Sequence, residues 1–283
     1  MKQKIIAGLA ILLIAAAAPG CGKKAKVKVV PAVSAPAASD EALYREGARY
    51  LKKDPERARL YMRQIMETFP QSFYAQRAKL TIADSYFKEG DEGNLILAAA
   101  EYTEFIRLHP SSPSASYAQY QVAMTYIRKP QKPGRDQQKT HQALVELKKL
   151  IATYPLAEEI KNARQRIIEC EERLAEHAVL IAEHYVRTKT YPAAVDRLTE
   201  ILTTYPAYKG MDRVYLALGT SYLGWGKPEQ AVPYLTKLVT DYPKSKLAGK
   251  GQKLLAAART AKPAKAPAAK PAKAPAAKPK AGK

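Results

Sequence analysis

Five apolar stretches recur along the chain, and each begins with an alanine and closes twelve residues later at a proline. The five pairs are Ala58/Pro70, Ala98/Pro110, Ala143/Pro155, Ala194/Pro206 and Ala231/Pro243. A ring-bearing residue stands before each proline, namely Phe69, His109, Tyr154, Tyr205 or Tyr242. Because proline stops a helix, each stretch is typical of a helix that ends there. Successive prolines lie 37 to 51 residues apart, which predicts an array of repeats that binds along a surface.

The fifth copy is the clearest template for one repeat. It contains Tyr215-x2-Leu218-Gly219-x2-Tyr222, Gly226, Ala231-x3-Leu235 and Pro243, a spacing that resembles the tetratricopeptide pattern. Small residues at Gly219 and Ala231 would let two antiparallel helices approach closely. We therefore expect an all-α fold, an α-solenoid of about five tetratricopeptide-like helix pairs over residues 40–257. The expected repeats are 40–72, 76–112, 116–157, 175–208 and 212–245.

The first three repeats are less regular than the last two. The second needs three extra residues around Asp91 to Ile96, and the third carries eight within its turn, between Ile127 and Thr140. In the first, the small residue expected before the second helix falls at Glu46, with Gly47 one place away. Insertions in such arrays map to one face and often to function.

The N-terminus has the pattern of a bacterial lipoprotein. Residues 1–20 form a signal peptide, with Lys2 and Lys4 before an apolar run that is too short to span a bilayer. Cys21 follows small residues, as in a lipobox, although Ala18 and Pro19 are unusual there. We expect Cys21 to carry lipid and residues 21–39 to form a flexible tether. Gly22, directly after the cysteine, is typical of lipoproteins sorted to the outer membrane. The alternative to a lipobox is an ordinary cleaved signal peptide followed by a stray cysteine.

The formal net charge of +21 resembles that of a nucleic-acid-binding protein, but the charge is concentrated at the two ends. Those ends hold 14 of the 47 basic residues and none of the 26 acidic ones, so the middle of the chain is only about +7. Residues 258–283 contain the sequence KPAKAPAA twice and predict a disordered tail. This tail is either a solvated extension or a contact with anionic envelope polymers or headgroups. No nucleic-acid partner is expected after export.

No catalytic, metal or cofactor motif is present. His177 and His184 lie seven residues apart, but no HExxH or Cys/His cluster accompanies them. The stretch from Gly219 to Lys227 resembles a phosphate loop, yet Trp225 stands where lysine is required. Cys170 lies within an expected helical run from Asn162 to Tyr185 and is expected to be a small core side chain. The chain is therefore predicted to be no enzyme and to need no cofactor and no metal.

A candidate peptide groove lies on the first helices of the second and third repeats, which normally line the concave face. Its expected residues are Arg77, Leu80, Asp84, Phe87 and Lys88, with Tyr117, Tyr120, Met124, Ile127 and Arg128. Many of the eighteen tyrosines fill repeat cores, but those on this face do not. Tyrosines beside a methionine and two arginines could hold an extended peptide that has aromatic side chains and a terminal carboxylate.

Several motifs together resemble one family over residues 41 to about 255. They are Phe105-Ile106-Arg107-Leu108-His109-Pro110 followed by Tyr117-x2-Tyr120, then Arg135-Asp136 seven residues before Ala143, and Tyr205-Pro206 with Arg197 nine residues before the proline. With five repeats behind a lipobox, the chain resembles the BamD family, lipoproteins of the outer-membrane β-barrel assembly machinery.

That resemblance implies a non-enzymatic scaffold on the periplasmic face of the outer membrane, anchored there by lipid. The N-terminal half would bind targeting segments of unfolded outer membrane proteins, and the C-terminal half would dock on the periplasmic domains of the barrel-forming subunit, with Arg197 at the contact. Other assembly lipoproteins would be further partners. The chain departs from the pattern at Val122, where an arginine is frequent, in its short third-repeat insertion and in its Lys/Ala/Pro tail.

An alternative is a periplasmic tetratricopeptide protein of the Tol-Pal and division machinery, whose repeats also end in Tyr-Pro and a small residue. Such proteins usually begin with a soluble signal and a coiled coil, and this chain has neither, which favours the first interpretation.

Overall fold

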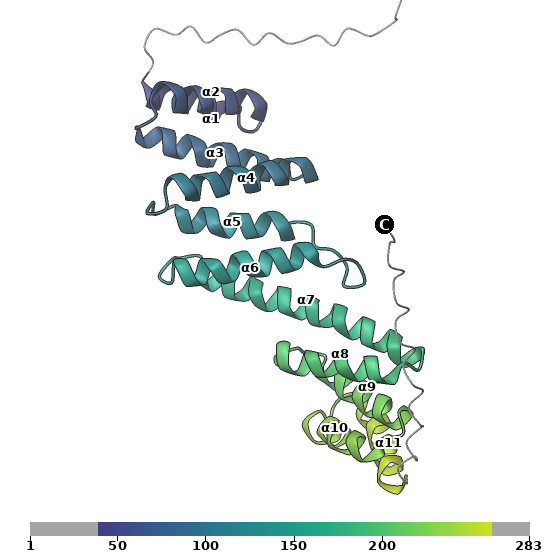
Figure 1. The fold of residues 1–283 in the computed structure, drawn as a ribbon. Helices are drawn as coiled ribbons and strands as arrows, with labels where there is room; N and C mark the ends of the chain where they lie inside the picture. Colours follow the sequence, from purple (N-terminus) through teal and green to yellow (C-terminus); the bar gives the residue numbers. More distant parts are fainter. Residues whose placement is uncertain (1–38, 262–283) are drawn as a thin grey trace, which may run out of the picture. The chain divides into compact units, whose positions relative to one another are not determined.

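The structure is a computed structural model that describes residues 39–261, in which the chain forms eleven α-helices and no strand. Each helix packs mainly on its neighbours in the chain, so successive antiparallel pairs stack in order (Figure 1). The expected all-α array of helix pairs is confirmed. The helices are α1 (Asp40–Tyr50), α2 (Pro55–Thr68), α3 (Phe73–Glu89), α4 (Glu92–Leu108), α5 (Ala115–Ile127), α6 (Gln138–Thr153), α7 (Ile160–Arg187), α8 (Tyr191–Thr204), α9 (Met211–Gly224), α10 (Pro228–Asp241) and α11 (Ala248–Thr260).

The second helix of every pair buries the same three positions. Counting from the alanine of the repeated motif, residues i, i+4 and i+7 share one helical face and are at most 1% exposed. These fifteen core residues are Ala58, Met62 and Ile65; Ala98, Tyr102 and Phe105; Ala143, Leu147 and Leu150; Ala194, Leu198 and Ile201; and Ala231, Leu235 and Leu238. The apolar pattern of the sequence is thus the packing pattern of the fold.

The ring-bearing residue before each proline ends its helix in one shared conformation. At all five positions φ lies between −133° and −127° and ψ between 50° and 62°. Its backbone N–H still donates to the carbonyl four residues earlier, over 2.8 to 3.2 Å. A residue before proline is kept out of the α region because the proline ring crowds it. The five rings are half-buried. After each proline the chain turns and enters the next helix.

Small residues allow close approach within the pairs. A Cβ at Gly219 would collide with the side chain of Leu235, and one at Gly47 would lie 2.7 Å from the Tyr61 Cβ. Gly47 is therefore the small residue at the contact in the first pair, one place after the position that the template marked at Glu46. The N-cap of α1 is Ser39, whose Oγ accepts the Ala42 N–H.

The three extra residues of the second repeat lengthen its helices. Only Gly90 and Asp91 separate α3 from α4, and both helices have 17 residues, against 14 in α9 and in α10. Gly90 has φ 70°, a left-handed conformation that suits glycine at a helix end.

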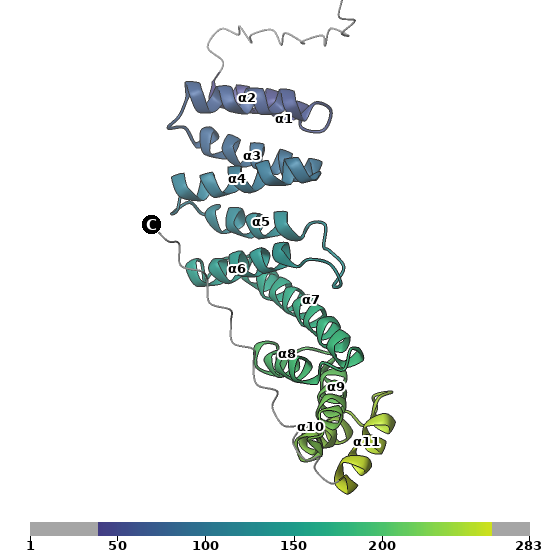
Figure 2. The ribbon, with the colours of Figure 1, turned by 45° about the vertical axis from the view of Figure 1, so that its right-hand side comes forward.

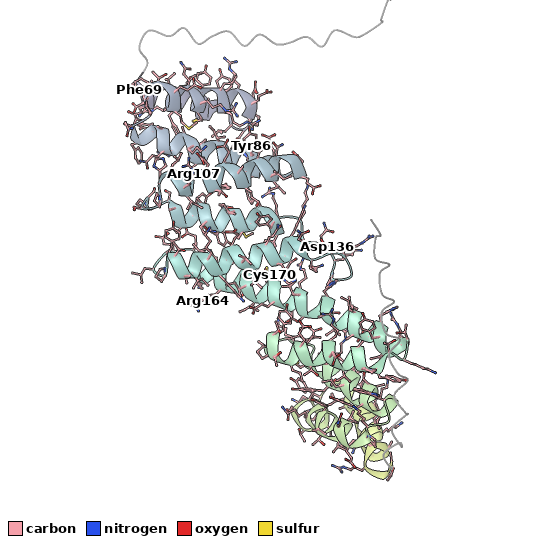
Figure 3. The ribbon with its side chains drawn as sticks, viewed as in Figure 1. Phe69, Tyr86, Arg107, Asp136, Arg164 and Cys170 are labelled. Atoms are coloured by element: carbon pink, nitrogen blue, oxygen red, sulfur yellow. The ribbon has the colours of Figure 1, made fainter. Side chains whose placement is uncertain are left out.

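The 28-residue helix α7 joins two cores. Its first half contributes Ala163 and Cys170 to the core of α5 and α6, together with Leu147. Figure 3 labels Cys170 on this helix. Its second half contributes Ala175 and Val179 to the core of α8 and α9. Residues 158–174, which fall between the expected third and fourth repeats, thus mostly belong to a helix that serves both. Burial raises the pKa of the Cys170 thiol to about 11.

The insertion of the third repeat is a loop from Arg128 to Gln137 that lies against α7. Gln137 is 3% exposed, and its side-chain amide donates to the carbonyls of Lys132 and Arg135. From α7, Arg173 donates to the Gln131 carbonyl at 3.0 Å, and the Nδ1–H of His177 donates to the Pro133 carbonyl at 2.6 Å. The inserted residues are therefore an ordered, hydrogen-bonded part of the array.

Helix α11 covers the last pair and packs on both α9 and α10 (Figure 2). A Cβ on its Gly251 would collide with Leu238, so this contact is also close. None of the helices between residues 39 and 261 combines the length and apolar character needed to cross a bilayer.

Leu198→Ala should lower the free energy of unfolding by about 2 to 5 kcal/mol, because it opens a cavity at a fully buried position. Leu156→Ala is the matched control: Leu156 is 97% exposed, so its loss should cost about 0.5 kcal/mol or less. Urea unfolding followed by circular dichroism measures both; equal losses would contradict the packing described.

Candidate peptide-binding groove

A cavity of about 610 Å³ lies over the first helices of the first three pairs. Four of the expected groove residues line it, namely Arg77, Leu80, Asp84 and Tyr117. Arg77 and Asp84 share a face of α3 because they are seven residues, or two helical turns, apart. Ser72 fixes the start of that helix, since its Oγ accepts the Tyr74 and Ala75 N–H groups. The remaining lining residues are Tyr44, Phe73, Gln76, Thr81, Phe105, Ser112, Pro113 and Ser114.

Asp84 is held by two tyrosines at one side of the cavity. Its Oδ1 accepts the hydroxyl of Tyr102 at 2.5 Å and that of Tyr117 at 2.8 Å. Burial raises the pKa of the Asp84 carboxyl above its ordinary range, although both hydroxyls favour the ionised form. Burial and the Asp84 charge together raise the pKa of Tyr117 to about 12. Tyr117 is thereby fixed as a neutral hydroxyl donor whose ring lines the cavity.

Arg77 supplies the positive charge of the cavity. Its guanidinium lies 4.9 Å from the centre of the Tyr44 ring, and the Tyr44 hydroxyl is 2.9 Å from that of Thr81. No carboxylate among residues 39–261 lies within 4.0 Å of Arg77. Phe73, at the start of α3, is 70% exposed. The cavity thus combines exposed aromatic surface with a guanidinium that has no ion-pair partner there.

Phe87, Lys88 and Arg128 form a separate cluster near the other end of α3. The Arg128 guanidinium stacks 4.4 Å from the Phe87 ring centre and donates to the Lys88 carbonyl at 3.4 Å. A Cβ at Gly90 would lie 2.8 Å from the Arg128 Nε, so glycine leaves room for this contact.

Tyr120 and Met124 belong neither to the cavity around Arg77 nor to the Arg128 cluster. Tyr120 packs with Ile127 against the core of α5, α6 and α7, and Met124 is half-buried. Val122 is 4% exposed and therefore faces the core, so the departure from the family pattern at this position leaves the cavity wall unchanged. The ten residues expected in one groove are divided between the cavity, the Arg128 cluster and a packed face.

Sequence reasoning missed Tyr44 and Phe73, which line the cavity. Tyr44 precedes Gly47 by three residues, so assigning the small contact position to Gly47 would have placed α1 in register. Phe73 follows the N-cap Ser72 directly, and a Ser before an apolar helix is a recognisable start signal.

Arg197 lies apart from the cavity, on the second helix α8. Its side chain is 55% exposed and pairs with Glu200 one turn away, at 3.2 Å. Cys21, the expected lipid attachment site, lies outside the described residues. Across residues 39–261, no group of three or more His, Cys, Asp or Glu side chains could hold a metal ion.

The sequence profile of the family described as YfiO, outer membrane lipoprotein, matches residues 36–231. The chain belongs to this family. The matched range includes the whole cavity and Arg197, and the resemblance predicted from the motifs is confirmed. Helix α11 lies beyond the matched range.

Curated relatives carry the name outer membrane protein assembly factor BamD. The protein of Neisseria meningitidis serogroup A is 27% identical over 218 residues, which is 73% of this chain and 80% of that protein. The protein of Caulobacter vibrioides is 28% identical over 224 residues, 79% of this chain and 72% of that protein. A solved tetratricopeptide protein of Thermus thermophilus is 17% identical with a TM-score of 0.31, and covers 78% of this chain and 99% of its own.

The raised pKa of Asp84 predicts the sign of a pH effect on stability. Because the folded chain holds this proton more tightly than the unfolded chain, the contribution of Asp84 should fall as pH rises from the ordinary aspartate pKa, about 3.9, through the raised value. Urea unfolding of wild type and Asp84→Asn over that range measures it. The wild-type stability minus that of the variant should decrease with pH; an increase, or the same trend for the exposed control Asp196→Asn, would contradict the assignment.

Proposed function

We propose that this chain acts in outer membrane protein assembly as a non-enzymatic scaffold that binds unfolded outer membrane proteins. Membership of a family of outer membrane lipoproteins supports this, as do relatives named outer membrane protein assembly factor. The observation that carries the proposal is the cavity over α1, α3 and α5, because it combines aromatic walls with an Arg77 that lacks an ion-pair partner among residues 39–261.

The client segment would enter as an extended chain that ends in a free carboxylate. Arg77 can take that carboxylate in a paired, charge-assisted contact, which is stronger than a neutral hydrogen bond. Phe73, Tyr44 and Tyr117 offer ring surface to apolar or aromatic side chains beside it. The hydroxyl groups of Tyr44 and Tyr117 are already hydrogen-bonded to Thr81 and Asp84. The walls are therefore pre-organised, which lowers the entropy lost on binding.

The cluster of Phe87, Lys88 and Arg128 would contact the same client further from its end. Ten residues of α3 separate Arg77 from Phe87, which is about 15 Å of helix. An extended peptide covers that distance with about five residues. Tyr120 and Met124 do not line the cavity. They would support the groove only by packing within the array, without contacting the client.

Arg197 would take part in docking on the barrel-forming subunit. Its pair with Glu200 is solvent-exposed, and exposed pairs contribute about 0 to 1 kcal/mol. A partner carboxylate could therefore replace Glu200 at little cost. Lipid on Cys21 would hold the scaffold at the periplasmic face of the outer membrane, beside the other assembly lipoproteins.

Arg77→Gln should weaken binding of a synthetic peptide with a free C-terminal carboxylate about 10- to 100-fold, since a charge-assisted bond of about 1.5 to 3 kcal/mol is lost. The peptide is taken from the C-terminus of a barrel protein of the same bacterium, and fluorescence polarisation with the full chain measures its affinity. The C-terminally amidated peptide should bind wild type and variant equally. Arg107→Gln, on exposed α4 surface outside the cavity, is the control. Equal affinity of wild type for the two peptides would refute carboxylate capture.

Arg197→Leu should reduce co-purification of the barrel-forming subunit without unfolding the array. Extraction in mild detergent followed by mass spectrometry measures the co-purified subunit, and circular dichroism checks the fold. Arg166→Leu is a matched control, because Arg166 forms the same kind of exposed pair with Glu169 three residues away. Unchanged co-purification argues against Arg197 as a docking residue. Recovery of Tol-Pal components without any barrel-assembly subunit would instead overturn the proposed function.

A further inference from the structure

A second cavity, of about 630 Å³, lies at the other end of the array, over the second half of α7, α9 and α11. It shares no residue with the cavity around Arg77. Part of its wall comes from Ser245 to Lys250, which lies beyond the residues matched by the family profile. Its lining residues are Glu183, Val186, Arg187, Asp212, Arg213, Leu216, Ala217, Thr220, Ser245, Lys246, Leu247 and Lys250.

The acidic side chains of this cavity already have ion-pair or hydrogen-bond partners within the protein. Glu183 pairs with Arg213 at 3.0 Å, and Arg213 also contacts Glu176 at 2.8 Å. The Asp212 carboxylate accepts the hydroxyl of Ser245 at 2.5 Å. These contacts fix the junction between α7, α9 and the start of α11.

Three cations in the wall have no such partner. Arg187, Lys246 and Lys250 are exposed, and none of them forms an ion pair with any of residues 39–261. The apolar side chains of Val186 and Leu216 line the same cavity, and Leu216 also packs against the core of α10 and α11. The cavity wall thus combines three exposed cations that lack an ion-pair partner among residues 39–261 with apolar side chains.

We propose that this cavity is a second peptide site, which binds a segment of a partner protein carrying acidic side chains beside apolar ones. Carboxylates would meet Arg187, Lys246 and Lys250, while an apolar side chain would cover Val186 and Leu216. The chain's own C-terminal tail does not fit, because residues 262–283 carry lysines and no acidic residue. Charge complementarity therefore selects an acidic partner over this basic tail.

Selection from a phage-displayed library of random 12-residue peptides against the full chain tests the site. Enriched peptides should include a class that combines Asp or Glu with Leu, Ile or Phe. Their affinities, measured by fluorescence polarisation, should fall about tenfold for the triple variant Arg187→Gln, Lys246→Gln, Lys250→Gln, because each exposed charge pair contributes modestly. The binding should also weaken as salt is raised.

The matched control is a second triple variant, Lys244→Gln, Lys253→Gln, Arg259→Gln, which removes three exposed cations near the same end of the chain but outside the cavity. Its affinities should change less than twofold. The proposal is overturned if no acidic and apolar class is enriched, if that class binds the cavity variant as tightly as wild type, or if the control variant loses affinity equally. None of these results would bear on the cavity around Arg77.

Discussion

The fully buried alanine near the start of every second helix sets how closely the two helices of a pair can approach. Because a methyl group fills little space, the residues four and seven positions later can reach the first helix and the next pair. All fifteen of these side chains are at most 1% exposed. Every pair is therefore held by the same three contacts, and the first helices are left free to present other side chains. Both proposed peptide sites lie on those first helices, and the second site also includes the start of α11.

Helix α7 connects the packing of one half of the array to that of the other half. One continuous helix supplies core residues to the third and the fourth pair, so the two halves share a rigid element. The loop from Arg128 to Gln137 adds hydrogen bonds from Arg173 and His177 to the same helix. A client bound near α3 and a partner bound near α8 would thus contact one connected scaffold.

Most of the fold could be predicted from sequence, because buried positions i, i+4 and i+7 hold apolar residues that the sequence shows directly. The site was harder to predict, because the register and length of each helix determine which side chains face the groove. Arg77, Asp84 and Tyr117 were found because they follow the helical period. Tyr44 was missed because the template put the small contact residue of α1 at Glu46, one place before its actual position at Gly47. The sequence predicted a helical run from Asn162 to Tyr185, which α7 contains, but not that this one helix serves two cores, because the repeat template begins only at residue 175.

Binding of unfolded outer membrane proteins in the cavity around Arg77 can be tested in the bacterium itself. The quantity to measure is the β-barrel protein content of the outer membrane after depletion of this chain, with wild type or Arg77→Gln supplied in its place. The account predicts that barrel content falls on depletion, recovers with wild type and recovers only in part with Arg77→Gln at equal protein level. Unaltered barrel content on depletion would contradict it.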